Sequence, residues 1–182
     1  MNTDGAGHLG YADVMPEDCR LVLSRDGKVV EERTGAYHGV ALDPAKHRYR
    51  LDYTVTPAAA RVSTSMRTVW EFDSAHTATG TALPLTAVGF APRLDLDNAA
   101  RVRATIGVPL TFTQQAGAGG VRSVRVHVSY DDGLSWLATP VVDRTAIVRH
   151  PAKAGYVSLR ATVVNGAGTT VTQTVLRAYE IR

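Results

Sequence analysis

Short runs of β-favouring residues, separated by turn sequences, recur along the whole 182-residue chain. In Tyr49–Val55, apolar and polar residues alternate with a period of two, which is typical of a strand with one buried and one exposed face. Asp26-Gly27 separates two apolar runs, and glycine tolerates the positive φ that a tight hairpin turn requires. No segment of ten or more residues sustains a helical period. The sequence therefore predicts an all-β fold.

A polar stretch at 74–83, rich in Ala, Thr and Gly, divides the chain and is interpreted as a linker. Residues 1–80 are expected to form a β-rich N-terminal piece. Residues 81–182 contain roughly seven strand-like runs, the number typical of an immunoglobulin-like sandwich. The fold prediction is an immunoglobulin/fibronectin-like β-sandwich packed against the smaller N-terminal piece. Its expected strands are Leu85–Phe90, Arg101–Gln114, Arg122–Tyr130, Leu134–Val142, Thr145–His150, Tyr156–Val164 and Thr170–Glu180.

Local features refine the sandwich prediction. Tyr156 begins the expected penultimate strand, where immunoglobulin domains place a tyrosine whose hydroxyl bonds back to upstream backbone. We therefore expect a tyrosine corner at Tyr156. Turns are expected at Asp131–Gly133 and Asn165–Gly168, and the glycine-rich loop Gly117–Gly120 is expected to be flexible.

The segment Ser129–Trp136 fits the Asp-box pattern Ser-x-Asp-x-Gly-x-Ser/Thr-Trp. In such a turn the Asp side chain bonds backbone groups, Gly takes a positive φ and Trp packs beneath the hairpin. We interpret it as a structural staple, with contact to a glycan or another partner as the alternative, since Asp boxes in sialidases lie away from the active site. The candidate binding residues are Asp131, Asp132, Gly133, Trp136 and Asn165.

The loop Leu94–Asn98 carries oxygen-bearing side chains of the kind that Ca²⁺ prefers. Asp95, Asp97 and Asn98 are the candidate ligands. The run holds only two carboxylates, whereas calcium takes about six to eight oxygens. Alternating Asp residues are equally typical of a solvated strand edge. We therefore expect no cofactor, with calcium at this loop as the alternative.

Charge and hydropathy bear on the class of partner. The net charge is +3, and the Lys and Arg residues are scattered rather than clustered with aromatic residues, so no nucleic-acid partner is expected. Apolar runs are too short for a membrane span, so no membrane partner is expected. Met1 is followed by polar residues rather than by a signal peptide. The abrupt start suggests a piece cut from a longer exported protein, which would be secreted.

Segments spread over nearly the whole chain carry a likeness to one family: Asp4–His8, Leu23–Gly27, Trp70–Phe72, Val126–Gly133, His150–Ala161 and Gln173–Tyr179. They resemble the C-terminal region of large secreted S8-family (subtilisin-like) serine peptidases of actinobacteria. In that family the catalytic Asp, His and Ser lie in an upstream domain, and none of those motifs is present in this sequence. Ser63–Met66 is similar to the serine-nucleophile segment Gly-Thr-Ser-Met-Ala, but Ser63 replaces its Gly and the stretch continues as a strand.

The resemblance implies that the chain is not an enzyme but an accessory module of an exported peptidase. Its expected partners are the catalytic domain of the parent protease, a protein substrate or cell-wall material. Stabilisation of the catalytic domain is a further expected role. The alternative is a purely structural spacer or folding aid without a ligand. A glycan-active or glycan-binding domain ranks last, because one Asp box cannot build the propeller that sialidases use.

Overall fold

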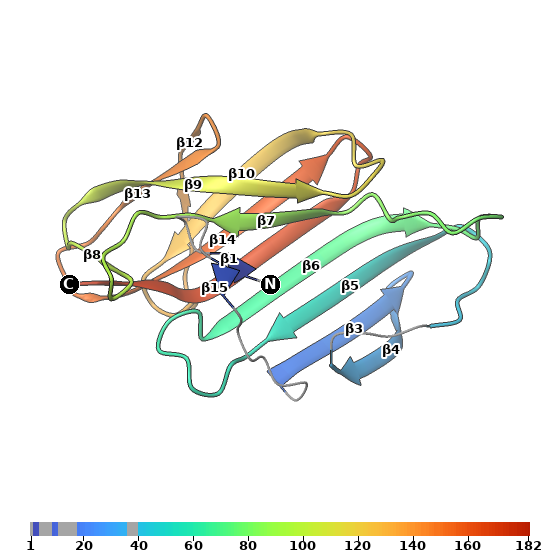
Figure 1. Ribbon diagram of the computed structural model, residues 1–182, viewed down its shortest axis with the longest axis horizontal. Helices are drawn as coiled ribbons and strands as arrows, with labels where there is room; N and C mark the ends of the chain where they lie inside the picture. The colour runs from blue at the N-terminus through green and yellow to red at the C-terminus, as the bar shows by residue number, and fades with distance from the viewer. Residues whose placement is uncertain (1, 4–8, 11–17, 36–39) are drawn as a thin grey trace.

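The computed structural model describes residues 2–3, 9–10, 18–35 and 40–182 (Figure 1). These residues form fifteen strands and no α-helix, so the all-β prediction is confirmed. The strands are β1 (Asn2–Thr3), β2 (Leu9–Gly10), β3 (Cys19–Arg25), β4 (Lys28–Thr34), β5 (His47–Val55), β6 (Ser65–Ser74), β7 (Thr86–Phe90), β8 (Ala99–Ala100), β9 (Thr105–Gln114), β10 (Val121–Ser129), β11 (Leu137–Thr139), β12 (Val141–Val142), β13 (Thr145–Arg149), β14 (Gly155–Asn165) and β15 (Thr170–Ile181).

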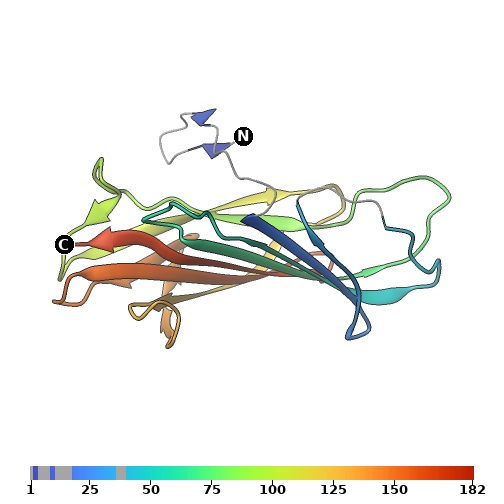
Figure 2. The ribbon, with the colours of Figure 1, turned by 90° about the horizontal axis from the view of Figure 1, so that it is seen from below.

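Two antiparallel sheets form the layers of a β-sandwich (Figure 2). The larger sheet has the order β11-β10-β14-β15-β6-β5-β3-β4, and β8 adds to it as a parallel partner of β15. The smaller sheet has the order β12-β13-β9-β7 and lies over the β10-β14-β15 part of the larger one. Strands β1 and β2 pair with each other as a separate two-stranded ribbon.

The main core fills the space between the two layers. On β14, Val157, Leu159, Ala161 and Val163 are fully buried, whereas Arg160 and Thr162 between them are only partly buried. Ser158 is also buried, at a β-bulge in the pairing with β15. Val108 on β9 packs in the same cluster from the opposite sheet. Burying one such aliphatic side chain stabilises the fold by about 1.5–3 kcal/mol, so the alternation on the long strands sets which face of each turns inward.

The N-terminal strands continue the larger sheet. Residues Ser65–Glu71 of β6 pair with Thr170–Leu176 of β15, so β3–β6 join β10, β14 and β15 through one hydrogen-bonded ladder. These strands carry a second small cluster in which the rings of Tyr49 and Phe72 stack at 5.9 Å beside Leu23. The predicted linker, residues 74–83, lies where the chain leaves β6 in the larger sheet and crosses to β7 in the smaller one.

Polar contacts clamp the two sheets at both ends. At one end the Asn165 amide, at the end of β14, donates to Pro84 O at 2.7 Å and to Thr86 Oγ1 at 3.1 Å. The Trp70 indole of β6 donates to Thr86 O nearby, at 2.8 Å. At the other end, the buried His150 ring lies 2.9 Å from the hydroxyl of Tyr179 on β15.

The expected strand Leu134–Val142 is divided in two. Its first part, β11, pairs with β10 in the larger sheet, and its second part, β12, pairs with β13 in the smaller one. Pro140 lies at the break. Proline lacks the N–H that a continuous ladder needs, and here the chain changes sheets at that point.

The tyrosine whose hydroxyl forms a hydrogen bond with the backbone is Tyr130 and not the predicted Tyr156. Tyr130 donates its hydroxyl to Arg149 O at 2.6 Å, which ties the end of β10 to the end of β13. The Tyr156 hydroxyl has no hydrogen-bond partner among the described residues, and its ring lies beneath the Arg177 guanidinium at 4.7 Å. The prediction of a tyrosine corner at Tyr156 is therefore wrong, because this ring faces a charged side chain on β15 instead of a carbonyl.

Candidate functional site

The Asp box is a compact turn that closes on itself. Ser129 Oγ donates to Asp131 Oδ1 at 2.7 Å and accepts from the backbone N–H of Gly133 at 2.8 Å. The Asp131 carboxylate also accepts from the backbone and the hydroxyl of Ser135. The Trp136 indole donates to Gly133 O at 2.9 Å. Every one of these contacts lies within the turn, which favours the staple interpretation.

These hydrogen bonds stabilise the charged form of Asp131. The contacts from the Ser135 hydroxyl, the Ser135 backbone and Ser129 lower the pKa of Asp131 from 3.8 to about 2. Because the folded pKa lies below the unfolded one, the stabilising contribution is complete above about pH 4 and is lost as the pH falls toward about 2. Between pH 4 and pH 2 we expect the free energy of unfolding to fall less for Asp131→Asn than for the wild type. Urea unfolding at each pH measures this quantity. Asp143→Asn, in an exposed turn, is the control, and an identical slope for Asp131→Asn and the wild type would contradict the interpretation.

Asp132 reaches out of the turn to β15. Its carboxylate accepts two hydrogen bonds from the Arg177 guanidinium, at 2.9 and 2.7 Å, and this contact lowers the pKa of Asp132. Arg177 has a positive φ of 50° beside a β-bulge, and its backbone N–H is held by Ser158 Oγ at 3.0 Å. The bulge turns the Arg177 side chain so that it bridges Asp132 and the ring of Tyr156.

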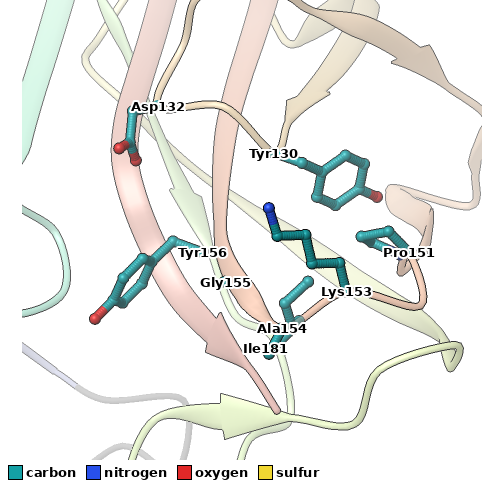
Figure 3. Close-up of a pocket in the computed structure, with 8 residues that line it drawn as sticks. All are labelled: Tyr130, Asp132, Pro151, Lys153, Ala154, Gly155, Tyr156 and Ile181. Carbon is teal, nitrogen blue, oxygen red and sulfur yellow. The ribbon is translucent and has the colours of Figure 1, made fainter.

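An open cavity of about 350 Å³ lies beside this bridge (Figure 3). The Lys153 side chain is exposed and extends between the rings of Tyr130 and Tyr156 in this view. Asp132 lines the same cavity. The arrangement offers a cationic donor, two phenol rings and a carboxylate to a ligand from outside. The remaining lining residues are Pro151, Ala154, Gly155 and Ile181.

The candidate loops lie at opposite ends of the sandwich. Strands β14 and β15 pair Gly155 with Ile181 at the cavity end and Val164 with Thr170 at the other. The eleven residues of β14 separate its ends by about 33 Å at the usual rise of a strand. The Asp box and the loop at 95–98 belong to the cavity end, since Asn98 O accepts from Glu180 N at 3.1 Å. The turn at 165–168 lies at the opposite end.

The predicted binding residues divide accordingly. Asp132 lines the cavity, whereas Asp131 is used within the Asp box. Gly133 has a φ of 89°, and a Cβ there would lie 3.0 Å from Leu176, which explains the glycine. One face of Trp136 is covered by the Arg160 guanidinium at 3.9 Å. Asn165 is 0% exposed, and its amide is used by Pro84, Thr86 and Thr169, so its geometry favours a structural role.

The two carboxylates proposed for calcium are bonded to an arginine. Arg182 Nη2 lies 2.8 Å from Asp95 Oδ2 and 2.6 Å from Asp97 Oδ2. Asp95 Oδ1 accepts from the backbone of Asp97 and Ala99, and Asn98 takes a positive φ of 58° that closes the loop. Among the described residues, no group of three or more His, Cys, Asp and Glu side chains could hold a metal ion. A cation bound here would have to displace the guanidinium.

Sequence reasoning missed most of the cavity. Tyr130 follows β10, Lys153 lies in the loop before β14, and Tyr156 lies near the start of β14. Each has an ordinary interpretation on its own, as a core or surface residue. The one available signal was the short spacing from Lys153 to Tyr156, at the start of the expected strand Tyr156–Val164. Tyr130 and Asp132 come close to Lys153 and Tyr156 because β10 pairs with β14, and the sequence does not show that pairing.

No protein-family model, curated protein or solved structure matches the chain. In the part of the chain that the structure describes, no helix is long and apolar enough to cross a membrane. The functional argument therefore rests on the geometry of the cavity and on the chemistry of its side chains.

Proposed function

We propose that the chain is a non-catalytic accessory module of a secreted subtilisin-like serine protease, and that it binds a protein substrate or another bulky partner. The observation that carries the proposal is the open cavity at one end of the sandwich, framed by Tyr130, Lys153 and Tyr156. Recognition groups held at the end of a rigid β-scaffold are the usual arrangement of binding modules with an immunoglobulin-like fold. The family resemblance of the tail segments supplies the secreted context.

The chemistry of the cavity suits a polypeptide partner. The Lys153 amine can donate to a carbonyl or a carboxylate, and the phenol rings offer flat apolar surface with a polar edge. The Asp132 carboxylate is held by Arg177, so it is oriented before any partner arrives. The cavity is open to solvent, which favours contact with a side chain on a large surface over the enclosure of a small molecule.

A co-sedimentation experiment tests the proposal. The purified chain is mixed with an insoluble protein or with purified bacterial cell wall, and the bound fraction is measured after centrifugation. We expect the wild type to pellet with at least one of them. Lys153→Ala and Tyr156→Ala should weaken binding by about fivefold or more, the loss of about 1 kcal/mol that marks an interface residue. Lys28→Ala, an exposed lysine at the start of β4, is the matched control.

Absence of wild-type binding to both materials, and to the catalytic domain of the parent protease, would contradict the proposal. That result would favour the second candidate, a rigid spacer that stabilises its neighbour. The observation that supports the spacer is the polar clamping of the two sheets by Asn165, Trp70 and His150. These contacts stiffen the sandwich whether or not it carries a ligand.

A further inference from the structure

A row of basic and hydroxyl side chains crosses the outer face of the larger sheet. The register places His127 on β10 opposite Arg160 on β14, and Arg160 opposite Thr174 on β15. Thr174 is opposite Arg67 on β6, and Arg67 is opposite Thr54 on β5. Side chains at paired positions point to the same face of a sheet. From Arg160 to Thr54 the row therefore alternates guanidinium and hydroxyl groups over neighbouring strands, at about 4.8 Å per strand.

Most arginines on this face have a carboxylate partner. Arg67 forms a two-pronged contact with Asp52, and Arg50 Nη1 lies 2.8 Å from Glu71 Oε1. Arg160 differs from them. No carboxylate of the described residues lies within ion-pairing distance of its guanidinium. Its plane instead covers the Trp136 ring at 3.9 Å, and its Nε donates to Thr174 Oγ1 at 3.2 Å.

Arg160 and Arg67 line one shallow groove of about 420 Å³ on this outer face. Thr174 lies between them in the register, and Thr162 and Thr172 form the next row of the groove, with their Oγ1 atoms 3.3 Å apart. Partial burial lowers the pKa of Arg160, and the positive charge of Arg67 lowers it further. Because Arg67 is already paired with Asp52, the unpaired positive charge of the groove belongs to Arg160, and an anion placed beside it would be attracted.

We propose that this groove binds a carboxylate side chain of a partner polypeptide, between Arg160 and Arg67 and against the hydroxyl groups of Thr172 and Thr174. A guanidinium fork matches the geometry of a carboxylate, and the Trp136 ring holds the Arg160 fork in one orientation before binding. The groove shares no lining residue with the cavity at Lys153. It stands independently of the accessory-module proposal, whichever way the co-sedimentation experiment turns out.

The surroundings of the groove select against other anions. Glu71 lines the same groove, and Asp52 lies on the next strand, so a polyanion laid along this face would meet fixed negative charge. A sugar ring would need an exposed aromatic face for stacking, but no aromatic side chain lines this groove, and Arg160 covers one face of Trp136. An isolated carboxylate beside neutral residues fits the guanidinium of Arg160, which contacts Trp136 and Thr174 instead of a carboxylate.

The test uses two short peptides with capped ends, Ala-Thr-Glu-Thr-Ala and Ala-Thr-Gln-Thr-Ala, titrated into the isotope-labelled chain and followed by amide chemical shifts. The Glu peptide should shift the amides of Arg160, Thr172 and Thr174. It should bind about tenfold more tightly than the Gln peptide, as expected for one charge-assisted contact in a partly exposed site. About 0.5 M salt should weaken the binding, since the Debye length then falls below about 5 Å.

Variants complete the experiment. Arg160→Gln should remove the preference for the Glu peptide, and Arg160→Lys, which keeps the charge without the planar fork, should retain part of it. Thr172→Val removes one hydroxyl with little change of shape and should weaken binding. Arg93→Gln, an exposed arginine outside the groove, is the control. Equal binding of the two peptides, no shift at millimolar peptide, the same preference in a folded Arg160→Gln variant, or tighter binding of a short polyphosphate to these residues would each overturn the proposal.

Discussion

For Asn165→Ala we expect the free energy of unfolding to fall by about 3 kcal/mol, since the cost is about 1–3 kcal/mol for each buried polar group left without a partner. The substitution leaves two backbone groups without their partners. Pro84 O loses the amide donor, and the Thr169 N–H loses Asn165 Oδ1, its acceptor at 3.0 Å. In a chain of this length the melting temperature should fall by roughly 6–12 °C. Urea unfolding and a thermal scan measure both quantities.

The matched control is Gln115→Ala, which removes an exposed amide side chain near the same end of the molecule. We expect it to change stability by less than about 0.5 kcal/mol, as is usual for surface substitutions. If Asn165→Ala were as mild as this control, the amide would not clamp β14 to β7. The hydrogen bonds of Asn165 would then not be what holds the two sheets together at this end.

Gly166→Ala is expected to destabilise the protein by about 3 kcal/mol, at the upper end of overpacking effects, because the new methyl group has no room. A Cβ at this position would lie 2.0 Å from Gly119 O and 2.6 Å from Gly119 C. These are backbone atoms of the neighbouring loop and cannot rotate away. Separating the loops would also break the hydrogen bonds from Gly166 N to Gly120 O and from Ala167 N to Ala118 O.

Gly80→Ala is the control for this substitution, since a Cβ there would meet nothing within 4 Å. It should leave stability unchanged or raise it slightly, because alanine restricts the unfolded chain more than glycine does. A melting temperature for Gly166→Ala equal to that of Gly80→Ala would show that the two loops do not touch as described.

The local features of the fold could be predicted because each depends on a few adjacent residues. Asp26-Gly27 forms the expected tight turn with φ values of 49° and 81°, and the period-two pattern of Tyr49–Val55 lies within β5. The break at Pro140 was missed, although proline in an expected strand is a warning sign. The loop Gly117–Gly120 was expected to be flexible, yet it is docked against the turn at 165–168, and nothing in a local window shows that contact.

The site was harder to predict, because its residues come together only through strand pairing. The Asp box was recognisable as a turn, and Asp132 does line the cavity. Asn165 was chosen from its place in a turn, but a turn residue can point inward as easily as outward. The row that joins Arg160 to Arg67 depends on the order β14-β15-β6. In this order β14 and β6, which are about ninety residues apart in sequence, both pair with β15. A period-two pattern shows which side chains share one face of a strand, but it does not show the order of the strands in the sheet.

The most direct test of the proposed accessory role compares a subtilisin-like protease that carries this module with the same enzyme without it. The two forms are assayed on a bulky insoluble protein and on a short chromogenic peptide, with Lys153→Ala in the full-length enzyme as a third form. If the module recruits a bulky partner through its cavity, its deletion and Lys153→Ala should both slow hydrolysis of the insoluble protein and leave the short peptide unaffected. Unchanged rates on both substrates, or an equal loss on both, would contradict the claim.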